Sequence, residues 1–164
     1  MVILGIDPGI AITGFGIISY EGNKLKPIHY GCIRTAANLP LSFRLKKIFN
    51  EIEILIKDYN PQETAIEEIY FNSNAKTAFA VGQARGVALL AMAKSNLNAS
   101  GYTPLQVKQA VVGYGRADKL QVQNMVKALL CLTKIPKPDD VADALAIAIC
   151  HAHSRKMNLV GSRE

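Results

Sequence analysis

Near its N-terminus the chain reads Val2-Ile3-Leu4-Gly5-Ile6-Asp7-Pro8-Gly9, an apolar run that ends in one carboxylate and a turn. The apolar residues predict a buried β-strand, and Pro8-Gly9 predicts the turn after it. Aspartate is rarely buried unless it is paired or binds a metal, so Asp7 is a candidate cation ligand or catalytic group. The alternative is that Asp7 only caps an Asp-Pro-Gly turn.

A second acidic strand end follows later in the chain. We expect strands at 2–7, 13–20 and 25–34, with a hairpin turn at 21–23, and then an amphipathic helix that Asn60-Pro61 ends. The next strand, 63–70, carries Glu67 and Glu68 near its end. Because side chains alternate along a strand, only one of the two glutamates can face an active site, and the spacing does not choose between them.

The second half of the sequence predicts helices at about 75–97, 104–112, 118–132 and 138–153, with a short strand ending at 102–103. Asp139, Asp140 and Asp143 fall at the start of the last helix. Acids in a first turn complement the helix dipole, which accounts for Asp139 and Asp140 but less well for Asp143, which apolar residues flank. His151 lies about 12 Å beyond Asp143 along this helix. We therefore exclude it from any metal site that the acids form, and expect a histidine at a helix end.

The positive charge of the chain is concentrated in one segment. Lys and Arg exceed Asp and Glu by 10 to 8 in residues 1–100 and by 6 to 1 in residues 101–137, whereas residues 138–164 hold 3 against 4. A basic segment beside candidate catalytic carboxylates indicates a polyanionic partner, nucleic acid before membrane. The alternative is a basic face that only improves solubility.

Composition limits the other function classes. A chain of 164 residues that is 49% hydrophobic is expected to form one domain over 1–164, with a flexible polar tail at about 154–164. No segment approaches the roughly 20 apolar residues of a membrane span, and Asp7 interrupts the only candidate leader. The three cysteines lack a zinc-binding pattern. We interpret them as reduced core thiols, which predicts a cytoplasmic protein without membrane contact.

The acidic strand ends and the acidic helix predict a shared site. The order of elements is typical of an α/β fold in which the strands of Asp7 and Glu67 lie parallel, so that their carboxyl ends converge. Carboxylates without histidine or thiolate partners favour Mg²⁺ or Mn²⁺ over zinc. Beside a basic surface, this arrangement is typical of two-metal phosphodiester hydrolysis.

Several motifs, in this order along the chain, resemble the RuvC family of bacterial Holliday junction resolvases, which belongs to the ribonuclease H-like superfamily. The resemblance covers about residues 2–153. The motifs are Gly5-Ile6-Asp7-Pro8-Gly9, Thr13-Gly14, Gly31-Cys32-Ile33-Arg34-Thr35, Ala65-Ile66-Glu67, Gly82-Gln83-Ala84-Arg85-Gly86-Val87-Ala88, Gln106-Val107-Lys108-Gln109, Val111-Val112-Gly113 and Ala142-Asp143-Ala144-Leu145-Ala146.

This resemblance implies a mixed five-stranded sheet with helices on both faces and four metal-binding acids, which are Asp7, Glu67, Asp140 and Asp143. It thereby selects Glu67 over Glu68 and Asp140 over Asp139. The site would hold two Mg²⁺ ions, with Mn²⁺ as a substitute. The departures from the family pattern, such as Ile10-Ala11-Ile12 after Pro8-Gly9, concern the loop and not the metal site.

The resemblance also implies DNA contacts. Lys108 and Lys119 match basic positions close to the scissile phosphate, and Tyr70 matches an aromatic position that stacks on bases near the junction centre. A core role for Tyr70 is the alternative.

Finally, the resemblance implies a homodimer that cuts two like-polarity strands of a four-way junction in recombination and repair, together with contact to a branch-migration motor. The helix at 75–97 is our candidate for the dimer contact, and the alternative is that its small residues serve packing on the sheet. Two alternatives remain, a junction-binding protein without catalysis and an RNA-processing nuclease of the same fold. An actin-like ATPase does not fit, because the chain lacks a second phosphate loop.

Overall fold

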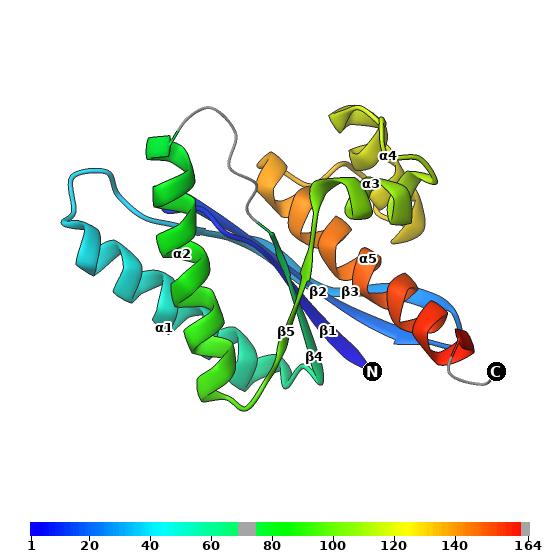
Figure 1. The fold of residues 1–164 in the computed structure, drawn as a ribbon, viewed down its shortest axis with the longest axis horizontal. Helices are drawn as coiled ribbons and strands as arrows, with labels where there is room; N and C mark the ends of the chain where they lie inside the picture. The colour runs from blue at the N-terminus through cyan, green and yellow to red at the C-terminus, as the bar shows by residue number, and fades with distance from the viewer. Residues whose placement is uncertain (69–74, 162–164) are drawn as a thin grey trace.

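The computed structural model describes residues 1–68 and 75–161 and contains a mixed five-stranded sheet in the order β3-β2-β1-β4-β5 (Figure 1). β1 (Val2–Asp7), β2 (Ile12–Glu21) and β3 (Lys24–Arg34) form an antiparallel meander. β4 (Glu63–Glu67) runs parallel to β1, and β5 (Ala99–Tyr102) runs parallel to β4. The α/β class and the mixed five-stranded sheet expected from the sequence are therefore confirmed.

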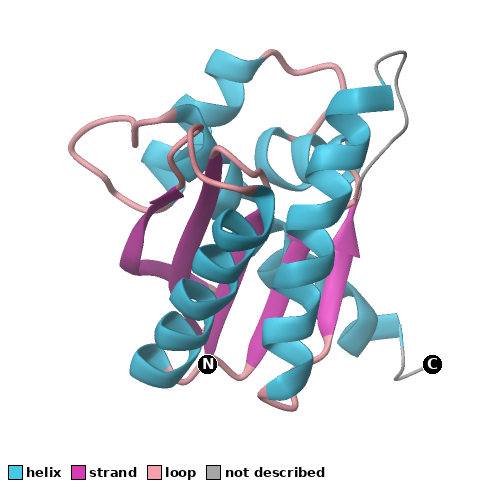
Figure 2. Ribbon diagram, turned by 90° about the vertical axis from the view of Figure 1, so that its left-hand side faces the viewer, coloured by secondary structure: helices cyan, strands magenta, loops and turns pink. Residues whose placement is uncertain are grey.

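Helices cover both faces of the sheet (Figure 2). α1 (Leu41–Tyr59) and α2 (Ala75–Lys94) pack on one face, where the core includes Leu4 and Ile6 of β1. α3 (Pro104–Val112), α4 (Lys119–Leu129) and α5 (Asp139–Gly161) lie on the other, where the core includes Ile3. Alternation along β1 therefore sends Gly5 and Asp7 towards the face that α5 covers.

The element ends follow local sequence signals, although several bounds differ from the prediction. Asn60 adopts a left-handed conformation (φ 45°) after α1, and the Thr103 hydroxyl accepts a 3.1 Å hydrogen bond from the Gln106 amide at the start of α3. β4 ends at Glu67 and not at 70, α2 at Lys94 and not at 97, and α4 at Leu129 and not at 132. α5 continues to Gly161 instead of ending near 153. Cys131 is exposed, so the prediction that all three cysteines lie in the core was wrong.

A polar cluster ties α5 to the sheet at the end where β4 begins. His151 is buried, with Nε2 2.7 Å from Oε2 of Glu63 and Nδ1 2.8 Å from the hydroxyl of Tyr102. Nε of Arg155 lies 2.7 Å from the other oxygen of Glu63. His151 therefore lies within α5 and joins it to β4 and β5, whereas the sequence predicted a histidine at a helix end.

Within the described residues, the chain contains no helix whose length and apolarity would let it cross a membrane.

Candidate metal and nucleic-acid site

Asp7 and Glu67 end neighbouring parallel strands. Ile6 of β1 is paired with Ile66 of β4, so the next residue on each strand carries one of the two carboxylates. Both point towards the face that α5 covers, because Ile3 and Ala65, at alternate positions of the same strands, belong to the core on that face. Glu68 instead lies against Gly101 of β5. Strand alternation in the structure thus separates the two glutamates, which the sequence alone could not do.

Glycines of β1 and β2 let the start of α5 approach this edge. Gly14 is the strand partner of Asp7, and a side chain at Gly14 would overlap the carbonyl oxygen of Asp140. A side chain at Gly5 would meet the carbonyl oxygen of Ala144 in the same way. Because glycine has no side chain, the first turns of α5, with Asp140 and Asp143, can pack closely against the strands beside Asp7.

The carboxylates of the cluster repel one another. Burial, followed by the charges of Glu67, Asp143 and Asp140, raises the pKa of Asp7 to about 8. Burial and the charge of Asp143 also raise the pKa of Glu67. Burial raises the pKa of Asp143, although Lys119 opposes the shift. Clustered, partly buried oxygen donors with this excess of negative charge fit a divalent hard cation.

The carboxylate oxygens are chemically suited to a divalent cation, but they do not surround a single point. Among the side chains that the structure describes, no three acids, histidines or cysteines have the spacing needed to ligate a single ion as they stand.

Lys119 pairs with two of the acids at the start of α5. Its Nζ lies 3.3 Å from Oδ2 of Asp139 and 3.4 Å from Oδ2 of Asp143. Asp139 also accepts a 2.7 Å hydrogen bond from Lys137. Hydrogen bonds from Lys137 and Lys119 lower the pKa of Asp139 to about 2. The side chain of Asp139 thus pairs with two lysines.

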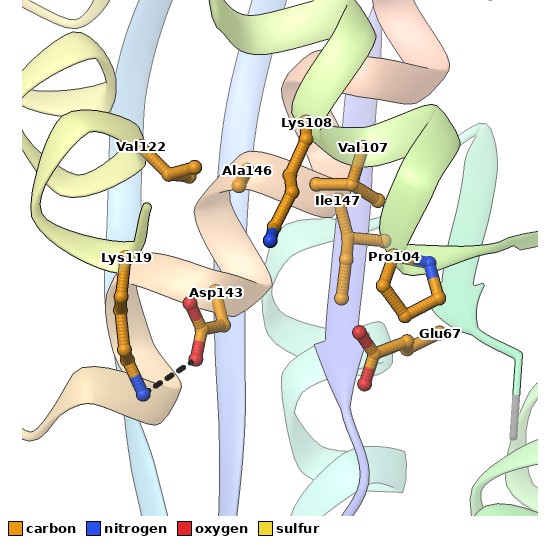
Figure 3. Close-up of a pocket in the computed structure, with 9 residues that line it drawn as sticks. All are labelled: Glu67, Pro104, Val107, Lys108, Lys119, Val122, Asp143, Ala146 and Ile147. Carbon is orange, nitrogen blue, oxygen red and sulfur yellow. Dashed lines mark ion pairs between the residues drawn. The ribbon is translucent and has the colours of Figure 1, made fainter. Parts of the chain in front are cut away.

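A cavity of about 230 Å³ separates the acids from the basic helices. In Figure 3, Glu67 and Asp143 face each other across it, Lys108 enters from α3 and Lys119 from the start of α4. The structure thus brings both predicted lysines to the acids. Tyr70, the predicted aromatic contact, lies outside the described residues.

Arg85 of α2 supports the site and was not singled out from the sequence. Its Nε donates a 3.1 Å hydrogen bond to the carbonyl oxygen of Glu67, at the point where β4 ends. The only sequence signal was its place in the 82–88 motif, which does not reveal a contact with another element.

Comparison with known proteins gives a consistent set of relatives. The family model described as Crossover junction endodeoxyribonuclease RuvC matches residues 3–151. A protein of that name from Alkaliphilus oremlandii is 62% identical over 154 residues, which are 94% of each chain. The Thermus thermophilus RuvC structure superposes with a TM-score of 0.90 at 36% identity, covering 96% of this chain and 97% of that one. T. thermophilus RuvC in complex with Holliday junction substrate gives a TM-score of 0.92 at 36% identity, covering 96% of each chain.

Proposed function

The chain belongs to the RuvC family and is a crossover junction endodeoxyribonuclease that resolves Holliday junctions, and we propose that it does so by cutting two strands of like polarity during recombination and repair. One observation carries the proposed chemistry. Burial and three neighbouring carboxylates raise the pKa of Asp7 to about 8, so this edge of the sheet has more negative charge than its own cations neutralise. Such a group of oxygens is suited to binding metal ions that act on a phosphodiester.

Nucleases of this family depend on divalent metal ions. The proposed ligands are Asp7, Glu67, Asp140 and Asp143, holding two Mg²⁺ ions, with Mn²⁺ as a substitute. When bound, the ions supply a nucleophile at neutral pH and stabilise the charge on the leaving oxygen. The role of the protein is to hold four carboxylates from β1, β4 and α5 at one place. Arg85 supports that role by fixing the backbone of Glu67.

Lys108 and Lys119 are the proposed contacts to the DNA backbone near the scissile phosphate. Both line the cavity that also contains Glu67 and Asp143, so a phosphate drawn to the lysines lies close to the acids. Tyr70 is the proposed stacking residue for bases near the junction centre, where stacking contributes about 1–3 kcal/mol per base.

We propose a homodimer that presents two such sites to the two-fold symmetry of a four-way junction. The outer face of α2 supports it: Phe79 is 70% exposed, Leu90 is 60% exposed, and between them Gly86 leaves room for a close approach of backbones. Positions 79, 86 and 90 share one helix face. A branch-migration motor is a further proposed partner, without a residue assigned to the contact.

Two alternatives predict different substrates. A junction-binding protein without catalysis would bind four-way DNA and leave it intact in Mg²⁺. An RNA-processing nuclease of the same fold would cut structured RNA as readily as junction DNA. The presence of all four acids and both lysines in one region favours the DNA resolvase over the first alternative.

The test is cleavage of an end-labelled, immobile four-way DNA junction in Mg²⁺, with linear duplex of the same sequence, a structured RNA and the Asp7→Asn variant as controls. We expect paired, symmetric nicks in strands of like polarity on the junction alone, and none with the variant. Junctions that are bound but remain uncut across several crossover sequences would contradict the proposal.

A further inference from the structure

A second cavity borders the acid cluster at the end of the sheet, between the start of α5 and the helices α1 and α2 of the opposite face. It measures about 430 Å³ and is lined by Gly9 to Ile12 of the β1–β2 loop, Leu41 and Arg44 of α1, Ala80 and Val81 of α2, and Asp140 of α5. Its walls are therefore mostly apolar, with one cation, Arg44, and one proposed metal ligand, Asp140.

Arg44 is held in place by a buried hydroxyl. Its Nε donates a 2.7 Å hydrogen bond to Oγ1 of Thr35, a residue that is 8% exposed. The Thr35 hydroxyl in turn donates to the carbonyl oxygen of Ile10, and its amide donates a 3.1 Å hydrogen bond to the carbonyl oxygen of Ala11. The guanidinium is thus anchored through one nitrogen to the loop that follows Asp7.

The charge of Arg44 has no carboxylate partner among the described side chains: no Asp or Glu oxygen lies within 4 Å of it, Asp140 included. Residues 69–77 contain no acid in the sequence, so they offer it none either. A partly buried guanidinium favours a hydrogen-bonded anion, and phosphate is an anion whose geometry its fork matches.

The geometry points to Arg44 as a phosphate-binding residue for the strand being cut, on the opposite side of the acids from Lys108 and Lys119. The apolar walls of the cavity suit the deoxyribose that adjoins this phosphate. The strand then crosses the edge of the sheet, with lysines of α3 and α4 on one side of the cut and Arg44 of α1 on the other. The inference rests on the proposed nuclease function of the site.

The salt dependence of junction binding tests it without catalysis. Affinities of wild type, Arg44→Gln, Arg44→Lys and Lys47→Gln are measured by fluorescence anisotropy in EDTA over a series of NaCl concentrations. Lys47 is an exposed residue of the same helix that does not line the cavity. We expect Arg44→Gln to lower the slope of log K against log [salt] by about one unit, and the other two variants to keep the wild-type slope. An unchanged slope for folded Arg44→Gln overturns the inference.

A measurement on the wild-type protein covers the case in which Arg44→Gln does not fold. Phenylglyoxal modifies arginine side chains, and the modified peptides are quantified by mass spectrometry with and without junction DNA. We expect DNA to protect Arg44 severalfold, but not Arg155, which pairs with Glu63 at the other end of the sheet. Equal modification of Arg44 in both samples overturns the inference. If wild type neither binds nor cuts junctions, the proposed function itself is wrong.

Discussion

The ammonium nitrogen of Lys119 lies 3.4 Å from Oδ2 of Asp143. Since Asp143 is a proposed metal ligand, Lys119 competes with metal ions for it in the absence of DNA. The lysine side chain is 56% exposed, so the ion pair contributes at most about 1 kcal/mol. We expect Lys119→Gln to bind Mn²⁺ about two- to fivefold more tightly, as measured by electron paramagnetic resonance, and yet to cut junctions more slowly. Weaker Mn²⁺ binding would show that Lys119 helps to assemble the metal site.

The raised pKa of Asp7 makes the stability of the metal-free protein depend on pH. The folded protein holds a proton on Asp7 up to about pH 8, whereas the unfolded chain releases it near 3.8. Between these two pH values only the unfolded chain loses the proton of Asp7, so the free energy of unfolding falls as the pH rises. In EDTA, we expect Asp7→Asn to raise the melting temperature at pH 9 more than at pH 5. Asp58→Asn, at an exposed position of α1, is the control and should change neither.

Lys108 lines the acidic cavity and is proposed to contact a phosphate. We expect Lys108→Ala to weaken junction binding and to lower the slope of log K against log [salt] by about one unit. Asp7→Asn is the matched comparison, because it removes a proposed metal ligand and no DNA contact, and its affinity in EDTA should stay close to that of wild type. A wild-type slope for Lys108→Ala would exclude its contact with the backbone.

Asp139 and Asp140 are adjacent in sequence but have different surroundings. Asp139 pairs with Lys119 and Lys137, whereas Asp140 borders the loop after Asp7. We expect Asp139→Asn to lower the cleavage rate by less than about threefold, since exposed ion pairs contribute little. Asp140→Asn should lower it by more than 100-fold, an order of magnitude expected when a positioned catalytic group is removed. Equal losses in single-turnover assays would show that the wrong aspartate has been assigned as the ligand.

Gly14 of β2 packs directly against the carbonyl oxygen of Asp140. A methyl group at Gly14 would overlap backbone atoms of Asp140, so the first turn of α5 would have to move away from β2. We expect Gly14→Ala to cost about 1–3 kcal/mol of stability, the usual range for overpacking, and to reduce cleavage. Urea unfolding and junction cleavage measure the two effects. A variant with wild-type stability would show that α5 can lie farther from the sheet.

The strands and the acids were predictable because each signal is local. The apolar run before Asp7 fixes β1, Asn60 ends α1, and Thr103-Pro104 starts α3, each through its own residues. The proximity of Asp7 and Glu67 was predictable because the carboxyl ends of neighbouring parallel strands lie at the same edge of a sheet. The choice of Asp140 over Asp139, in contrast, came only from family resemblance.

The rest depends on contacts between elements far apart in sequence. The anchoring of Arg44 to Thr35 joins α1 to β3, and the contact of Arg85 with Glu67 joins α2 to β4. Neither residue differs in type or spacing from an ordinary exposed arginine on a helix. The roles of His151 and of Gly14 were missed for the same reason, because their partners lie on other strands or helices.

The cluster around His151 sets the position of α5 along its own axis. The buried surface of this helix mixes alanines, including Ala144 and Ala148, with the larger side chains of Leu145 and Ile147, whose packing already opposes sliding along the sheet. A shift of one turn would also part the buried His151 from Tyr102 and Glu63, at a cost of about 1–3 kcal/mol for a buried group that loses its hydrogen bonds. The histidine thus helps to keep Asp140 and Asp143 level with the strand ends, although it lies about 12 Å from Asp143 along the helix.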